Sequence, residues 1–410
     1  MRSLSFRLAV LAAALTAPLA AGTALAADRP TTPSIDLGVP TVDDTPAGDV
    51  VAGEEVAAPT ALGYRSAAPL VLRYPGSTYV KVHFNALDLA PGDRVTVADP
   101  TGREVHTYHG DPTAGGAAAG DSSYTIHRTR GFAAMSIDGD TAVVTLHRAG
   151  SARQSAVTLD RAGLGVRVDR VWRGFDAVEY RAHNRAVCGQ DARKNVVCYK
   201  EKFPTEYARG QAVARAQMKG SGYCTAWRVG NTNRMLTNNH CIGDAATAKA
   251  TEFQFAYQCD TCTGTTPGAA TKVSGVEMFK TNKTLDYTLV SVNDFEKIKS
   301  FGTLYLDPRK PTDGETIYIP GHGDAKPNRL SIFEEPDEAK RCSVYRTQGT
   351  RTAYNCDTSG GNSGSPVLAQ STHKVIVLHN TGSCPNNNGG NAIVDIFPEI
   401  QSMIDNNPPA

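Results

Sequence analysis

Gly360-Gly361-Asn362-Ser363-Gly364-Ser365-Pro366 is the stretch of this sequence that decides its fold and chemistry. A serine hydroxyl is a weak nucleophile unless a base removes its proton. Glycines before the serine let the backbone turn sharply and present N–H groups to the oxyanion that forms during acyl transfer. We therefore predict that Ser363 is a nucleophile and that the N–H groups of Gly361 and Ser363 form an oxyanion hole. Taken alone, the motif also fits a Gly/Ser-rich surface loop.

Two further segments supply the groups that such a nucleophile needs. His240 follows the short apolar segment Met235-Leu236-Thr237 and precedes Cys241, so a cross-link from Cys224 would fix the backbone that carries this base. Asp286 enters an alternating segment, residues 285–292, that we expect to be a buried strand. A buried carboxylate is unusual unless it is paired. We predict that Asp286 orients His240, and that Asp260 and Asp294 lie in loops instead.

The chain order His240, Asp286, Ser363 is that of the double-barrel serine proteases. The α/β-hydrolases and the subtilisins place the same three groups in other orders. The three groups predict a serine endopeptidase acting through an acyl-enzyme on a protein or peptide. An esterase and a non-catalytic secreted binding protein with a protease-like domain remain alternatives.

The segment from Cys188 to about Ile396 resembles the bacterial lysyl endopeptidases and, more loosely, the glutamyl endopeptidases of the chymotrypsin-like clan. The resemblance rests on the histidine, aspartate and serine segments and on the cysteines between them. It implies an all-β fold whose C-terminal part is a double β-barrel protease domain. It also implies three disulfides: Cys188–Cys384, Cys198–Cys262 and Cys224–Cys241. We expect Cys342 and Cys356 to form a fourth, because they are close in the sequence and are the remaining pair. Cys259 is then left over.

The residues that would select the substrate depart from the lysyl pattern. The loop 385–391 carries no acidic residue, but Asp357 precedes Ser363 by the six residues that separate the pocket acid from the serine in trypsins. A carboxylate there would pair with a basic side chain, so we expect cleavage after Arg or Lys, unless Asp357 only binds loop N–H groups. His379 resembles the glutamyl-branch histidine and would favour acidic side chains instead. Asn380 and Gly382, which follow it, are expected in the same pocket.

The part of the chain before the cysteines divides into segments by composition. We expect a signal peptide over 1–26, a disordered or extended leader over 27–60, an antiparallel β-sandwich-like domain over 61–169 and a connector over 170–185. In the expected β domain over 61–169, Val80, Val82 and Phe84 alternate along one strand face. Residues 186–410 form the expected protease domain, with a helix over 205–218. The N-terminal domain is expected to be a propeptide, released near Arg185.

Bulk properties exclude several partners. The net charge is +1, which gives no global field for nucleic acid or for an anionic membrane. The apolar run of the signal is too short for a stable membrane anchor, and no later segment is apolar enough to span a bilayer. Cys259 and Cys262 form a lone CxxC without a second ligand pair, so we expect no metal and no cofactor. Export predicts an extracellular protein with disulfides. The oligomeric state is not determined by these features.

Overall fold

The computed structural model describes residues 50–110, 124–126, 131–149, 155–183, 190–382 and 388–409, and of 124–126 and 181–183 only the backbone. All of them belong to one compact unit. The expected signal peptide, Cys188, Cys384 and the release site near Arg185 lie outside the described residues. Within the described residues, no helix is both long and apolar enough to cross a bilayer.

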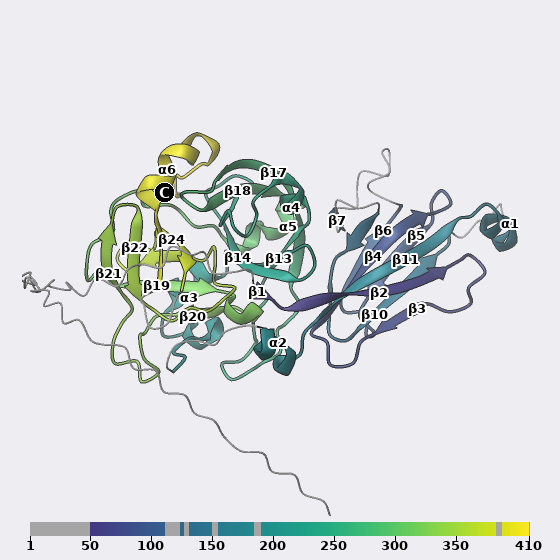
Figure 1. The fold of residues 1–410 in the computed structure, drawn as a ribbon, viewed down its shortest axis with the longest axis horizontal. Helices are drawn as coiled ribbons and strands as arrows, with labels where there is room; N and C mark the ends of the chain where they lie inside the picture. The colour runs from purple at the N-terminus through teal and green to yellow at the C-terminus, as the bar shows by residue number, and fades with distance from the viewer. Residues whose placement is uncertain are drawn as a thin grey trace, which may run out of the picture. The chain divides into compact units, whose positions relative to one another are not determined.

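Two antiparallel sheets form the N-terminal part of the described chain (Figure 1). The first has the order β2 (Gly53–Leu62), β11 (Gly165–Gly174), β4 (Tyr79–Asp88), β8 (Phe132–Ala134) and β7 (Tyr124–Ile126), with β9 (Ile137–Asp138) also on β4. The second has the order β3 (Leu70–Arg73), β10 (Thr141–His147), β5 (Arg94–Ala98) and β6 (Val105–Tyr108). Their facing side chains form one apolar core.

Strand β4 confirms the expected alternation, and its other face is buried as well. Val80, Val82 and Phe84 are fully buried in the core between the two sheets, as their alternation predicts. Lys81 and His83, on the opposite face, are fully buried as well. A polar residue at alternate strand positions is normally solvated, so this second face of β4 must be covered by another part of the protein.

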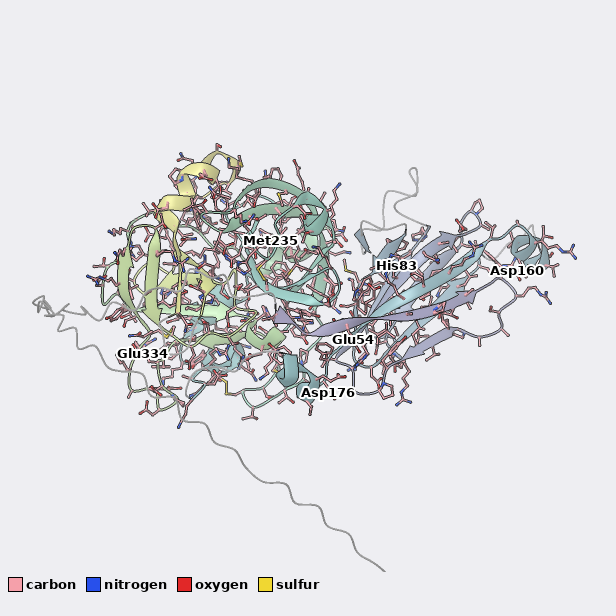
Figure 2. The ribbon with its side chains drawn as sticks, in the orientation of Figure 1. Glu54, His83, Asp160, Asp176, Met235 and Glu334 are labelled. Atoms are coloured by element: carbon pink, nitrogen blue, oxygen red, sulfur yellow. A yellow bond between two sulfur atoms is a disulfide. The ribbon has the colours of Figure 1, made fainter. Side chains whose placement is uncertain are left out.

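Residues 50–60, expected in a disordered or extended leader, are ordered and extended. They form β1 (Val50–Val51) and most of β2, which pairs along β11 from Gly53 to Leu62. This stretch is rich in alanine and acidic residues, so its strand character comes from pairing with a distant segment. The connector contains helix α2 (Ala177–His183), whose first N–H groups are capped by Asp176 (Figure 2). Helix α1 (Ala156–Arg161) precedes β11.

A closed antiparallel barrel follows. Its strands run in the order β14 (Gly222–Arg228), β13 (Val213–Met218), β16 (Thr251–Phe255), β17 (Thr271–Asn282), β18 (Tyr287–Val292) and β15 (Met235–Thr237), and β15 pairs back onto β14. Met235 lies in its core (Figure 2). Short helices α4 (Ala245–Lys249), α5 (Phe295–Ile298) and η2 (Lys299–Phe301) connect the strands. The helix expected over 205–218 is wrong beyond Gly210, because α3 (Pro204–Gly210) ends there and β13 begins at Val213.

The last sheet curls into a second barrel-like layer. Its order is β12 (Lys194–Asn195), β20 (Arg329–Ser331), β19 (Ile317–Gly321), β23 (Pro366–Ala369), β24 (Val375–Thr381), β25 (Asn388–Ala392), β22 (Arg351–Asn355) and β21 (Ser343–Gln348). A bridge between Thr316, just before β19, and Ser343 of β21 curls one end of the sheet back onto its third strand. Helix α6 (Ile393–Ile400) and the 3-10 turns η1 (Val196–Tyr199), η3 (Gly323–Ala325) and η4 (Gln401–Met403) complete it.

One apolar cluster joins the two barrels. It includes Trp227 and Leu289 of the first barrel, Leu368 and Leu378 of the second, and Ile396 of α6, all nearly or fully inaccessible. The strand connectivity and this shared core establish the expected all-β, chymotrypsin-like double-barrel fold, preceded by additional β-sheets. The serine loop of the second barrel is hydrogen-bonded to β14 of the first barrel, and a disulfide joins β14 to the segment that carries His240.

Candidate active site

His240 and Asp286 come together at one end of the first barrel. His240 follows β15, and Asp286 directly precedes β18, which pairs with β15. The Nδ1 atom of His240 lies 2.8 Å from Asp286 Oδ2, and the His240 backbone N–H donates to Asp286 Oδ1 at 3.0 Å. The carboxylate thus binds both the ring and the main chain of the same histidine. With Nδ1 carrying the proton, Nε2 is left as the basic nitrogen.

Asp286 is held in an unusual backbone conformation. It does not lie within the buried strand, as we expected, but one residue before it, with φ of +47°. Non-glycine residues adopt this left-handed conformation rarely, and Asp is among those that tolerate it best. The side-chain amide of Asn238 donates to the Asp286 carbonyl at 2.8 Å and so supports the turn. Asn238 is completely buried.

The serine loop is attached to the first barrel through β14. Thr225 N–H donates to the Ser363 carbonyl at 2.8 Å, and the Thr225 hydroxyl donates to the Gly361 carbonyl at 2.8 Å. The indole of Trp227 donates to the Gly364 carbonyl at 3.0 Å. Gly361 and Gly364 have φ of +93° and +87°. At Gly364 a Cβ would also collide with the Thr225 carbonyl, so this close approach of two backbones requires glycine.

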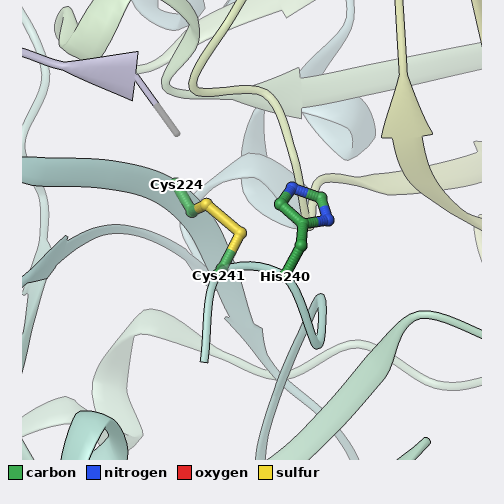
Figure 3. A group of neighbouring side chains, drawn as sticks. All are labelled: Cys224, His240 and Cys241. Atoms are coloured by element: carbon green, nitrogen blue, oxygen red, sulfur yellow. A yellow bond between two sulfur atoms is a disulfide. The ribbon is translucent and has the colours of Figure 1, made fainter. Parts of the chain in front are cut away.

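A disulfide links the same strand to the histidine. Cys224, next to Thr225, is bonded to Cys241, next to His240 (Figure 3). The two sulfurs and an imidazole nitrogen lie within 4.8 Å of one another, but sulfurs joined in a disulfide do not offer metal-binding thiolates. Thr225 and Cys224 therefore fix the serine loop and the histidine loop to adjacent positions of β14.

The nitrogen predicted to act as the base and the two N–H groups predicted to bind the oxyanion make no hydrogen bonds with the described residues. His240 Nε2 is buried and makes no hydrogen bond with any described residue, Ser363 included. Among the described residues, no protein acceptor takes the N–H of Gly361 or of Ser363. Catalytic hydrogen bonds are often formed only when the substrate is bound. The predicted base and both predicted oxyanion donors thus remain free to bind other groups.

The two candidate pocket residues have different surroundings from those expected. Asp357 Oδ2 accepts the backbone N–H of Ala192 at 2.7 Å, and burial raises the pKa of this half-buried carboxyl. His379 is buried, and its Nδ1 lies 2.5 Å from the Tyr354 hydroxyl. Burial, together with the charge of Arg351, lowers the pKa of His379 to about 3. This histidine is neutral near neutral pH and cannot itself supply a positive charge.

The sequence did not single out Arg351 and Thr358, which lie near the expected pocket residues Asn380 and Gly382. The Arg351 guanidinium, from β22, donates to Asn380 Oδ1 at 2.7 Å and to Thr381 Oγ1 at 2.6 Å. The buried Thr358 hydroxyl has no partner among the described residues, and a Cβ on Gly382 would lie 3.2 Å from it. No sequence motif marks Arg351, because it reaches the pocket from a strand that is remote from the serine loop.

The remaining cysteines complete the framework. The structure joins Cys198 to Cys262, as the resemblance implies, and Cys342 to Cys356, as their proximity in the sequence predicts. Cys259 is free and buried. The expected pair of Cys188 and Cys384 lies outside the described residues.

Residues 224–377 match a family model described as a trypsin-like peptidase domain. The matched segment contains His240, Asp286 and Ser363. It covers less than half of the chain and begins at Cys224, so the N-terminal sheets lie outside it. This match is consistent with a serine peptidase.

Two relatives and two solved structures are similar to this chain. "Secreted RxLR effector protein 73" of Plasmopara viticola is 28% identical over 75% of this chain and 76% of its own. "Uncharacterized protein y4fB" of Sinorhizobium fredii is 30% identical over 40% of this chain, which is 25% of its own. A Glu endopeptidase structure gives a TM-score of 0.41 at 21% identity over 54% of this chain and 99% of its own. An inactive form of the Rv3671c protease gives 0.36 at 11% identity over 50% and 95%.

Proposed function

We propose that this protein is a secreted serine endopeptidase whose catalytic groups are Ser363, His240 and Asp286. The observation that carries the proposal is the double hydrogen bond from His240 to Asp286 beside a nucleophile loop whose N–H donors are free. The match to the trypsin-like peptidase family supports it. The sites of the three disulfides agree with an oxidising, extracellular setting.

The geometry supports a defined sequence of steps. His240 Nε2 removes the Ser363 proton as the hydroxyl attacks the peptide carbonyl, and Asp286 stabilises the resulting imidazolium. The N–H groups of Gly361 and Ser363 bind the developing oxyanion. His240 then returns the proton to the leaving amine, and water hydrolyses the acyl-enzyme by the reverse route. Protein or peptide is therefore the substrate.

Active-site labelling tests this proposal. A fluorophosphonate should label the wild-type protein at Ser363, and Ser363→Ala should lose both labelling and peptide hydrolysis. Ser371→Ala, at an exposed serine a few residues further on, is the matched control and should keep both. Full labelling of the Ser363→Ala protein would show that another residue is the nucleophile. A folded wild type that neither reacts with the reagent nor cleaves any substrate would favour a non-catalytic binding protein, whereas ester cleavage without peptide cleavage would favour an esterase.

For the primary specificity, the pocket favours acidic side chains. One carboxylate oxygen of Asp357 accepts a hydrogen bond from the Ala192 N–H. The positively charged guanidinium of Arg351, in contrast, lies against Asn380 and Thr381. A substrate carboxylate there would gain charge-assisted hydrogen bonds, and the Thr358 hydroxyl is a further donor. The positive charge comes from Arg351, because His379 is neutral. Cleavage after Arg or Lys, through the second oxygen of Asp357, is the alternative.

Parallel assays separate the two specificities. Peptides that differ only in Glu, Asp, Arg, Lys or Phe before the cleaved bond should show a preference for Glu or Asp. Arg351→Gln should reduce that preference about tenfold or more, as loss of one charge-assisted bond costs about 1.5 to 3 kcal/mol, and Asp357→Ser should leave it unchanged. A preference for Arg or Lys that disappears in Asp357→Ser would establish the alternative.

The N-terminal segments fit a precursor. We propose that residues 1–26 are removed on export and that the β domain acts as a propeptide, with processing near Arg185. Sequencing the N-terminus of the secreted active protein tests this. A start at Ala27 or Asp28 in fully active protein would show that the domain is retained.

A further inference from the structure

One edge of β14 is taken by the N-terminal end of the described chain. Along one side β14 pairs with β13 over its whole length, but along the other it pairs with β15 only at Trp227 and Arg228. At Thr225 the N–H of β14 donates to the Ser363 carbonyl, and at its first two residues, Gly222 and Tyr223, β14 pairs antiparallel with β1 (Figure 1). Ala52 N–H extends the pairing by donating to the Ser221 carbonyl at 3.0 Å.

The same edge leads to the nucleophile. Thr225, two residues beyond Tyr223, is the residue whose N–H binds the Ser363 carbonyl. Because β1 is antiparallel to β14, Val50 is the end of β1 that is nearer to Ser363. Two strand residues span about 7 Å. A chain paired on this edge therefore lies within one or two residues of the reacting serine.

The side chain of Val50 also contacts the serine loop itself. Val50 is only 4% exposed, and its Cγ2 atom fills the space that a Cβ on Gly360 would occupy. Gly360 immediately precedes the oxyanion donor Gly361. Val51 points to the other face of the strand and is 39% exposed. Thus β1 is bound through both backbone pairing and one buried side chain.

We propose that β1 is an intramolecular ligand of this edge and keeps the intact chain latent toward extended substrates. This inference rests on the proposed peptidase function. An unpaired strand edge beside a nucleophile is where an extended peptide binds by adding a strand. In the intact chain β1 already occupies that edge, and β2, which is continuous with it, holds it at a high effective concentration. Release of β1 exposes the edge.

The arrangement predicts a distinct kinetic pattern. If only a small fraction of molecules has β1 detached, the apparent affinity for an extended substrate falls by that fraction. Pairing of β1 with β14 therefore raises KM for an extended substrate. A small reagent that binds only Ser363 and the oxyanion donors does not need the edge of β14, so its rate of reaction is unchanged.

The test compares two substitutions in the same strand. Val50→Asp places a charge in the buried contact with Gly360 and should detach β1, whereas Val51→Asp makes the same change on the exposed side. Mass spectrometry first verifies that each protein is full length. We then expect Val50→Asp to raise kcat/KM on denatured casein about tenfold or more, because KM falls. Val51→Asp should stay near wild type. Fluorophosphonate labelling of Ser363 should proceed at the same rate in all three. Val50→Thr keeps the shape of the side chain and should give a smaller increase in kcat/KM on casein. If Val50→Asp does not fold, the result with Val50→Thr decides the test.

The outcomes separate this inference from the proposed function. Normal labelling with equal casein hydrolysis in the wild type, Val51→Asp and a folded Val50 variant would overturn the latency of β1 and leave the peptidase intact. Lower casein hydrolysis in the Val50 variants with normal labelling would show that β1 assists the site, and would overturn the inference too. Absence of labelling in every folded protein would overturn the proposed function.

Discussion

At the scale of single residues, Asp286 couples an uncommon backbone conformation to a double contact with His240. The carboxylate binds the ring Nδ1 and the backbone N–H of the histidine at 2.8 and 3.0 Å. An amide at this position can donate to Nδ1, which would place the imidazole proton on Nε2 and block its role as a base. The backbone contact alone then holds the loop in place.

We predict that Asp286→Asn lowers kcat on the order of 10⁴-fold because of this tautomer change. Asp294→Asn is the matched control, since Asp294 also has a left-handed backbone, with φ of +45°, and its carboxylate binds Lys297 at the surface. It should keep near-normal turnover. Steady-state kinetics and thermal melts of both variants make the comparison. Similar losses in the two variants would assign the effect of Asp286 to its backbone conformation.

At the scale of elements, the Cys224–Cys241 disulfide joins β14 to the histidine loop, and the Cys342–Cys356 disulfide joins the ends of the β21–β22 hairpin. They close loops of similar size, with sequence separations of 17 and 14. On the loop-closure model each contributes about 3 kcal/mol to the free energy of unfolding. Only the first is next to the proposed base.

Replacing either pair by alanine should therefore lower stability by a similar amount but activity by different amounts. We expect the Cys224→Ala, Cys241→Ala protein to lose most of its kcat at a temperature where it is still folded. The Cys342→Ala, Cys356→Ala protein should retain kcat and differ mainly in its unfolding midpoint. Denaturant unfolding and initial rates measured at the same temperature distinguish the two. Equal kcat in both would mean that β14 does not position His240 through this bond.

At the scale of the whole molecule, the face of β4 opposite its apolar core meets β16 and β17 of the first barrel in a buried ionic cluster. Lys81 Nζ lies 2.6 Å from Glu252 Oε2, and Lys272 Nζ lies 2.6 Å from Glu104 Oε1. Burial tends to raise the pKa of each glutamate, but the lysines hold the pKa of Glu252 well below its usual value and that of Glu104 at about 2. The N-terminal sheets are therefore attached to the barrel by charges that depend on ionised carboxylates.

This cluster predicts that cleavage of the connector alone does not release the N-terminal domain. The glutamate pKa values are lowered by docking, so the stabilisation is complete above about pH 4.3 and is lost as the pH falls toward about 2. A chain cut near Arg185 should elute as one species at pH 7 and as two near pH 3 in size-exclusion chromatography. Glu252→Gln leaves Lys81 buried without its carboxylate and should separate at higher pH, whereas Glu296→Gln, at an exposed carboxylate, should not. Separation of the cut wild type at pH 7 would contradict the role of the cluster.

The sequence by itself predicted the serine loop, the histidine and aspartate segments and the apolar face of β4. These predictions depend on residue type and short-range pattern, which a chain displays directly, whereas two of the three disulfides of the described residues were implied by the family resemblance. Only the tertiary structure decided the rest. Lys81 lies at a strand position where the polar and apolar alternation predicts exposure to solvent. It is buried because the first barrel, whose residues lie more than a hundred positions away in the sequence, covers it. Arg351 lies against Asn380 and Thr381, and Val50 contacts Gly360, through strand pairings whose register is set by partners remote in sequence.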